Sequence, residues 1–198
     1  MTSPRHAQSI ADPRAAIDSA IEFWQTAGKA GHWFDKSEAF DRRFRDSFQD
    51  LHHAAARREL DAWAEGPVSA GTARGVLALL ILLDQYPRNA FRGTGHMYAT
   101  DPLARFFAKR ALDAGLDAHV PSDLRLFFYL PLSHSEQLAD QQRALMLNRK
   151  LGEPFASHAQ GHLDIVARFG RFPHRNPMLG RLTTDEEAEF LRQGGFAG

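Results

Sequence analysis

The chain has 198 residues, equal numbers of acidic and basic side chains, and no cysteine. This length is sufficient for one compact domain with a substantial core. The formal net charge of zero argues against a protein that binds nucleic acid or a membrane over its whole surface. The lack of cysteine excludes disulfides, thiolate metal ligands and a cysteine nucleophile.

The sequence carries no signal for export or membrane insertion. Its first residues lack the apolar stretch of a secretory signal, and the longest apolar run, Val76 to Leu83, is far shorter than the roughly 18 residues of a membrane span. We therefore expect a cytoplasmic protein that binds neither membrane nor nucleic acid. No shift in composition divides the chain, which predicts a flexible N-terminus (1–8), a single helical domain (9–191) and a C-terminal tail (192–198).

The aliphatic side chains predict an all-α fold. Ala and Leu far outnumber Val and Ile, and small or unbranched side chains lose little entropy in helices. Capping and helix-breaking residues predict about eight helices, packed as consecutive antiparallel hairpins. The expected helix starts are Asp12, Ser37, Ser69 or Thr72, Thr100 or Asp101, Ser122, Ser135, Glu153 and Thr184.

Two of these helices have clear apolar patterns. One carries a core-facing stripe at helical spacing, formed by Phe40, Phe44, Phe48, Leu51 and Ala55. The run from Val76 to Leu83 predicts a central helix that is apolar on all sides. Pro87 is expected to end it. Asp84, at the foot of this helix, needs a cationic partner because an unpaired buried carboxylate is costly.

The same turn chemistry occurs twice. Tyr86-Pro87-Arg88-Asn89 leaves one apolar helix, and Phe172-Pro173-His174-Arg175-Asn176 leaves another. Each is followed within a few residues by arginine, glycine and threonine. A mechanical explanation suffices, since proline stops helices, asparagine tolerates left-handed backbone and arginine covers terminal carbonyls.

A functional interpretation follows from charge. The stretch from Arg168 to Thr184 is rich in arginine and contains no acidic residue. Guanidinium groups suit carboxylates and phosphates, so two adjacent turns predict a site for an anionic small molecule or an acidic peptide end. Turns that lie apart predict ion pairs with Asp84, Glu136 or Asp164 instead. The expected ligand-binding residues are Arg88, Asn89, Arg92, His134, Arg171, Arg175, Asn176 and Arg181.

A hydrolase or transferase using the same pocket is the alternative. Ser133-His134-Ser135-Glu136 combines a hydroxyl, an imidazole and a carboxylate, with His134 or His162 as general base and Glu136 or Asp84 orienting it. However, Ser133 and Glu136 also have the spacing of a capping box. Ser135 as nucleophile lacks the Gly-x-Ser-x-Gly elbow.

The sequence predicts no metal and no cofactor. His158 and His162 are one helical turn apart, with Asp164 or Glu136 as a conceivable third ligand, but Ala159 stands where the zinc-protease motif requires glutamate. Gly161 favours a tight contact that buries His162. The pair His52-His53 lies among charged neighbours and is expected at the surface.

Three strings resemble the bacterial domain-of-unknown-function 924 family. They are Leu82-Leu83-Asp84-Gln85-Tyr86-Pro87-Arg88-Asn89, Tyr129-Leu130-Pro131-Leu132-Ser133-His134-Ser135-Glu136, and Arg168-Phe169-Gly170-Arg171-Phe172-Pro173-His174-Arg175-Asn176 with Leu179-Gly180-Arg181. The resemblance implies an all-α, tetratricopeptide-like right-handed array of helical hairpins, and it implies no reaction. A ligand site, an enzyme and a purely structural polar network therefore stay open as alternatives.

Overall fold

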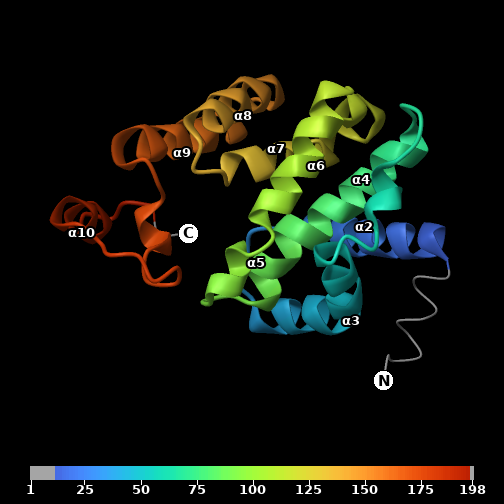
Figure 1. The fold of residues 1–198 in the computed structure, drawn as a ribbon, viewed down its shortest axis with the longest axis horizontal. Helices are drawn as coiled ribbons and strands as arrows, with labels where there is room; N and C mark the ends of the chain where they lie inside the picture. Colours follow the sequence, from blue (N-terminus) through green and yellow to red (C-terminus); the bar gives the residue numbers. More distant parts are fainter. Residues whose placement is uncertain (1–11, 197–198) are drawn as a thin grey trace. The chain divides into compact units, whose positions relative to one another are not determined.

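The computed structural model describes residues 12–196, and within this range the chain forms helices and turns without a strand (Figure 1). The α-helices are α2 (Pro13–Lys29), α3 (Glu38–Ala56), α4 (Ala70–Leu80), α5 (Tyr86–Ala90), α6 (Asp101–Asp113), α7 (Leu126–Ser133), α8 (Leu138–Leu151), α9 (Phe155–Phe169) and α10 (Asp185–Arg192). A π-helical turn over Ile81–Gln85 joins α4 to α5. With these three counted as one helix, the described residues confirm the expected all-α fold of about eight helices.

Local capping explains where many of these helices begin. The side chains of Asp12, Ser37 and Ser69 each accept a hydrogen bond from a backbone N–H in the first turn of α2, α3 and α4. Thr184 and Glu187 form a capping box at the start of α10. None of the helices in the described range is long and apolar enough to span a bilayer.

The chain divides into two compact units. Within the described residues, unit 1 comprises residues 12–92 and 96–131, and unit 2 comprises residues 93–95 and 132–196. The core of unit 1 surrounds α4, which packs against α2 and α6. Gly75 of α4 allows a close approach, because a Cβ atom there would lie 2.0 Å from the carbonyl oxygen of Trp63.

The central helix does not end at Pro87, contrary to the sequence prediction. Pro87 is the second residue of α5 and lies in the same continuous helix. Proline lacks an N–H and leaves the carbonyl four residues earlier without its usual donor. Here the hydroxyl of Thr100 donates to the Leu83 carbonyl at 2.5 Å, and the His52 imidazole donates to the Leu82 carbonyl at 2.9 Å. Side chains from elsewhere in unit 1 thus satisfy the carbonyls that the π turn and the proline release.

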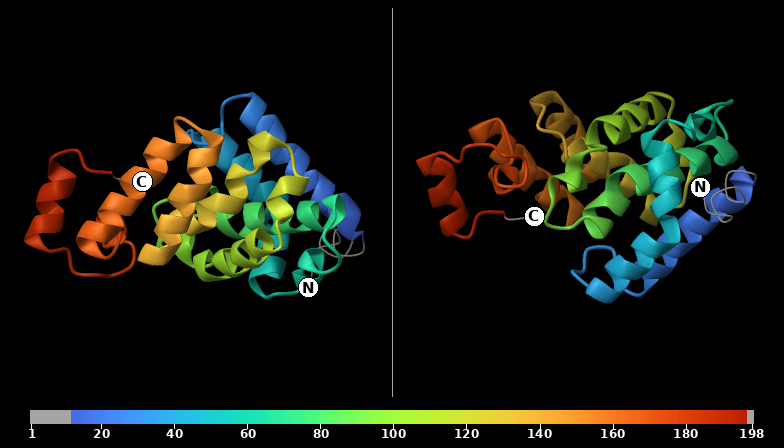
Figure 2. Two further views of the ribbon diagram at one scale, coloured as in Figure 1. Left: turned by 90° about the horizontal axis from the view of Figure 1, so that it is seen from above. Right: turned by 60° about the horizontal axis from the view of Figure 1, so that its bottom comes forward.

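Unit 2 is built on the hairpin of α8 and α9, which lie side by side (Figures 1 and 2). Gly152, with a φ of +85°, and the following Glu153-Pro154 connect them. Gly170, with a φ of +69°, ends α9 in a left-handed conformation that favours glycine. Ile165 and Val166 of α9 form a small buried core with Phe172, which anchors the start of the second proline turn.

Candidate functional site

The first proline turn lies in unit 1, and its arginines are engaged by carboxylates. Arg88 forms a two-pronged pair with Asp101, at 2.8 and 3.0 Å, and its Nη1 lies 3.3 Å from Asp84. Burial alone would lower the pKa of Arg88, but Asp84 and Asp101 outweigh it and raise the pKa. The buried Asp84 thus has the arginine partner that the sequence required.

Arg92 is held in the same way. Its guanidinium donates to both oxygens of Asp41, at 2.8 and 3.0 Å, and to the side-chain oxygen of Asn89 at 3.1 Å. The amide of Asn89 donates in turn to the Gln85 carbonyl. In unit 1 the predicted ligand residues Arg88, Asn89 and Arg92 therefore stabilise the turn that contains them.

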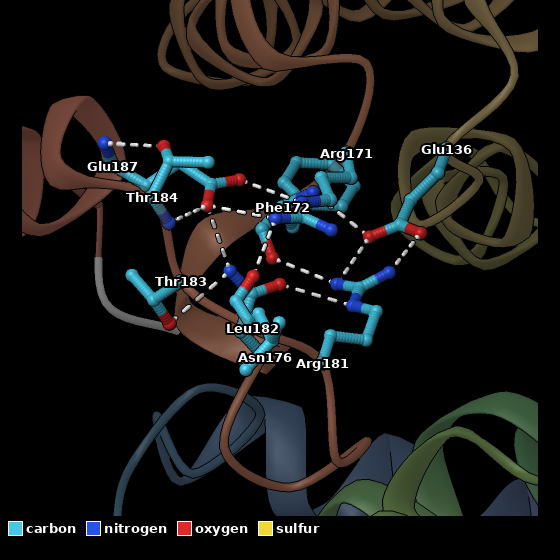
Figure 3. A network of polar contacts seen from close by, with 9 residues as sticks. All are labelled: Glu136, Arg171, Phe172, Asn176, Arg181, Leu182, Thr183, Thr184 and Glu187. Carbon is cyan, nitrogen blue, oxygen red and sulfur yellow. Dashed lines mark hydrogen bonds and ion pairs between the residues drawn. The ribbon is translucent and has the colours of Figure 1, made fainter.

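The second turn lies in unit 2 and is part of a larger polar network (Figure 3). Glu136 accepts from Arg181 at 2.7 and 3.0 Å and from the backbone N–H of Phe172 at 2.8 Å. Burial alone would raise the pKa of Glu136, but these donors lower it. Ser133 ends α7 and α8 begins at Leu138 with Gln137 as its N-cap, so Ser133 and Glu136 do not start a helix as the expected capping box requires.

Glu187 is the second carboxylate of this network. It accepts from Arg171 at 2.6 and 2.8 Å and from the Asn176 amide at 3.1 Å. Asn176 also accepts from Arg181, so one amide links the two ion pairs (Figure 3). The hydrogen bonds from Arg171, together with donors from Thr184, lower the pKa of Glu187 to about 2.

Three arginines of the acid-free stretch pair with acidic residues outside it. Arg171 pairs with Glu187 and Arg168 with Glu186, both in the first turn of α10. Arg181 pairs with Glu136, which precedes α8. The signal available in the sequence was the acidic run at the predicted start of the last helix.

Two imidazoles in unit 2 have a different environment. His162 of α9 and His174 of the second turn both pack against Phe172 and Phe196, with ring-centroid distances between 4.8 and 5.7 Å. The Nδ1 atoms of both histidines are buried and have no hydrogen-bond partner among the described residues. Such an atom is costly and calls for an explanation.

Basic side chains, one of them an arginine, surround this pair. Burial, and after it the charges of His134, Arg175, His174 and His158, lower the pKa of His162 to about 3. Burial and then Arg175 lower the pKa of His174 to about 4, partly opposed by Glu136. The guanidinium of the buried Arg175 lies over the Phe172 ring, 4.6 Å from its centroid. We call His134, His162, His174 and Arg175 the imidazole cluster.

Unit 2 thus contains His134, Glu136, His162, Arg171, Arg175, Asn176 and Arg181 from the predicted set, whereas Asp84, Arg88, Asn89 and Arg92 belong to unit 1. Sequence reasoning missed His174 and Phe196 as site residues. His174 is visible in the second turn string, but Phe196 has no motif around it.

The hydroxyl of Ser135 is used structurally. It donates to Asp140 at 2.8 Å and accepts from the Gln137 backbone N–H at 3.1 Å, which shapes the start of α8. In the described part of the chain, no three His, Asp or Glu side chains are grouped to hold a metal ion. A shallow hollow on α2, lined among others by Asp18, Glu22 and Arg43, contains none of the predicted residues.

Comparison with known proteins finds a solved structure with a similar fold and a matching family. A chain with 57% sequence identity has a solved structure, that of protein ATU0120 of unknown function from Agrobacterium tumefaciens. The match covers 92% of this chain and 100% of that chain, with a TM-score of 0.86. The sequence profile of the family described as bacterial protein of unknown function (DUF924) matches residues 20–195, and the chain belongs to this family. No curated protein matches the chain.

Proposed function

We propose that unit 2 binds an anionic small molecule or an acidic peptide end at the imidazole cluster. The observation that carries the proposal is the pair of buried Nδ1 atoms of His162 and His174, which have no hydrogen-bond partner among the described residues and lie near the Arg175 guanidinium. An anion beside them would accept from the imidazoles and favour their protonated forms. It would supply the hydrogen-bond partner that both Nδ1 atoms lack among the described residues.

The ion pairs of unit 2 distinguish residues that stabilise the fold from residues that contact the ligand. Arg171 and Arg181 form two-pronged pairs with Glu187 and Glu136, so we assign them to the scaffold. Asn176 joins these pairs and belongs with them. The role of ligand contact falls to the four members of the imidazole cluster.

Phe196 determines how a ligand reaches the imidazoles. Its ring packs edge-on to His162 and His174 and is itself 43% exposed. Gly194, with a φ of +85°, and Gly195 precede it. A ligand therefore enters by displacing one side chain near the end of α10, without opening the core of Ile165, Val166 and Phe172.

Thermal unfolding with sulfate, phosphate, succinate and a short acidic peptide tests the proposal. At a ligand concentration ten times Kd, binding to the folded state alone adds about 1.4 kcal/mol, which raises Tm by roughly 3–6 °C for a chain of this size. His174→Gln should abolish the rise. The matched control is His119→Gln, which changes an exposed histidine of unit 1.

Chloride at equal ionic strength separates specific binding from screening of surface charges. An equal Tm rise in wild type, His174→Gln and His119→Gln would refute the assignment. So would the absence of any rise with all four ligands.

A further inference from the structure

A second histidine pair lies in unit 1, and one of its members corrects the sequence prediction. His52, expected at the surface, is fully buried on the inner side of α3. Its Nδ1 atom lies 2.9 Å from the Leu82 carbonyl oxygen, which the π turn frees from its usual helical donor. Because a carbonyl oxygen only accepts, Nδ1 carries the proton. In the neutral ring, Nε2 therefore carries the lone pair.

The lone pair of His52 faces another imidazole. His96 lies in the short 3₁₀ turn Gly95–Tyr98, and its exposed ring packs on Phe91 with a centroid distance of 3.9 Å. The two Nε2 atoms are 3.5 Å apart. That separation is long for a hydrogen bond, in which a nitrogen donor lies about 2.7–3.2 Å from its acceptor. Two imidazole nitrogens bound to one tetrahedral ion at 2.0–2.1 Å lie about 3.4 Å apart.

The surroundings of His52 match those of a metal-ligating histidine. Such histidines commonly donate their second N–H to a backbone carbonyl, which fixes the ring and the tautomer. The Leu82 carbonyl provides this contact, and the Tyr86 ring stacks on His52 with a centroid distance of 4.7 Å. Burial lowers the pKa of His52 to about 4, which keeps the ring neutral at physiological pH.

We propose that His52 and His96 bind a divalent transition-metal ion of the zinc class through their Nε2 atoms. The described residues contain no group of three metal-ligating side chains, so water completes the coordination from the exposed side of His96. A site with two protein ligands and open positions binds more weakly than a closed four-ligand structural site. It leaves coordination positions free for an exchangeable ligand.

Calorimetric titration of the full, tag-free chain with Zn²⁺ tests the proposal, and visible absorption with Co²⁺ reports the coordination geometry. His96→Ala is the decisive variant because the removed ring is exposed, so folding is preserved. It should weaken Zn²⁺ binding by at least about tenfold and abolish the Co²⁺ absorption band of a tetrahedral site.

His158→Ala is the matched control, since His158 and His162 form the other histidine pair at ligand spacing. It should leave the affinity unchanged. Equal affinity in wild type and His96→Ala, or a loss confined to His158→Ala, would show that His52 and His96 do not bind the ion. The result is independent of anion binding, because the imidazole cluster lies in unit 2.

Discussion

Arg181 holds Glu136 with two hydrogen bonds, 2.7 and 3.0 Å long, although 45 residues separate them in the chain. Glu136 also accepts from the backbone N–H of Phe172, and Arg181 donates to the Phe172 carbonyl. One ion pair thereby fixes both polar groups of the residue that starts the second proline turn. The pair is half-buried, so solvent screens it only in part.

Breaking this pair should destabilise the protein. Glu136→Gln leaves a half-buried guanidinium without its carboxylate, and we expect a loss of about 1–3 kcal/mol in the free energy of unfolding. Urea unfolding followed by circular dichroism measures it. Arg168→Ala removes an exposed pair with Glu186 and should cost less than about 1 kcal/mol. Equal losses in the two variants would contradict the special role of the Glu136–Arg181 pair.

The continuity of the central helix depends on Thr100. Thr100→Val keeps the shape of the side chain but removes the donor to the buried Leu83 carbonyl, which should cost about 1–3 kcal/mol. Chemical denaturation measures the change. Thr26→Val, an exposed position on α2, is the matched control and should shift stability by less than about 1 kcal/mol. An unchanged free energy of unfolding in Thr100→Val would mean that the Leu83 carbonyl needs no side-chain donor.

Stability should fall as the pH drops from 6.5 toward 4. In the unfolded chain His52, His162 and His174 bind protons near pH 6.5, whereas burial lowers their folded-state pKa values to about 4, 3 and 4. In this window the unfolded state binds more protons, so stability rises with pH. Each histidine contributes at most about 1.4 kcal/mol per pH unit.

Urea midpoints measured between pH 5 and 7 test this dependence. His174→Gln should reduce the slope, and His119→Gln should not. Parallel slopes in wild type and His174→Gln would show that His174 titrates alike in the folded and unfolded chains.

Anion binding at the imidazole cluster should strengthen as the pH falls. An anion raises the lowered pKa values of His162 and His174, so binding takes up protons. Sulfate keeps its charge between pH 5 and 7, so changes in its affinity report the protein alone. We expect up to about a tenfold gain per pH unit for each proton taken up. Isothermal titration in buffers of different ionisation enthalpy measures both the affinity and the number of protons taken up. A pH-independent affinity would place the anion elsewhere.

Removing Phe196 should open the same cluster. Phe196→Ala uncovers His162 and His174 and should increase both sulfate affinity and the rate at which diethyl pyrocarbonate modifies these histidines. Mass spectrometry of the modified peptides gives the rate at each site. Phe34→Ala, an exposed aromatic of unit 1, is the control. Unchanged rates at both histidines would exclude Phe196 as the cover.

The sequence predicts the features of this fold that depend on local chemistry. The caps at Asp12, Ser37 and Thr184 and the helix end at Gly170 are confirmed because each depends on residues within one turn. Features that depend on distant partners were not predictable in this way. The helix runs through Pro87 because Thr100 and His52, far along the chain, satisfy its carbonyls.

The same distinction applies to the candidate site. The spacing of Ser133 and Glu136 fits a capping box, but Ser135 shapes the start of α8, and Glu136 is held by Arg181 and Phe172. The arginine-rich stretch is visible in the sequence, but Glu187, the partner of Arg171, belongs to a helix that begins after the stretch ends. Local patterns indicate which polar side chains are candidates, whereas tertiary contacts decide which of them are engaged in ion pairs.

The capping box at α10 has a practical consequence for shortened forms of this protein. Glu187 serves Thr184 within its own helix and Arg171 and Asn176 outside it, so one carboxylate joins the last helix to the second proline turn. A version truncated before Asp185 would leave the Arg171 guanidinium and the buried Asn176 amide without their carboxylate acceptor. Expression plasmids designed to trim the C-terminal end should therefore keep all of α10, and a stop codon beyond Phe196 also keeps the ring that packs on His162 and His174.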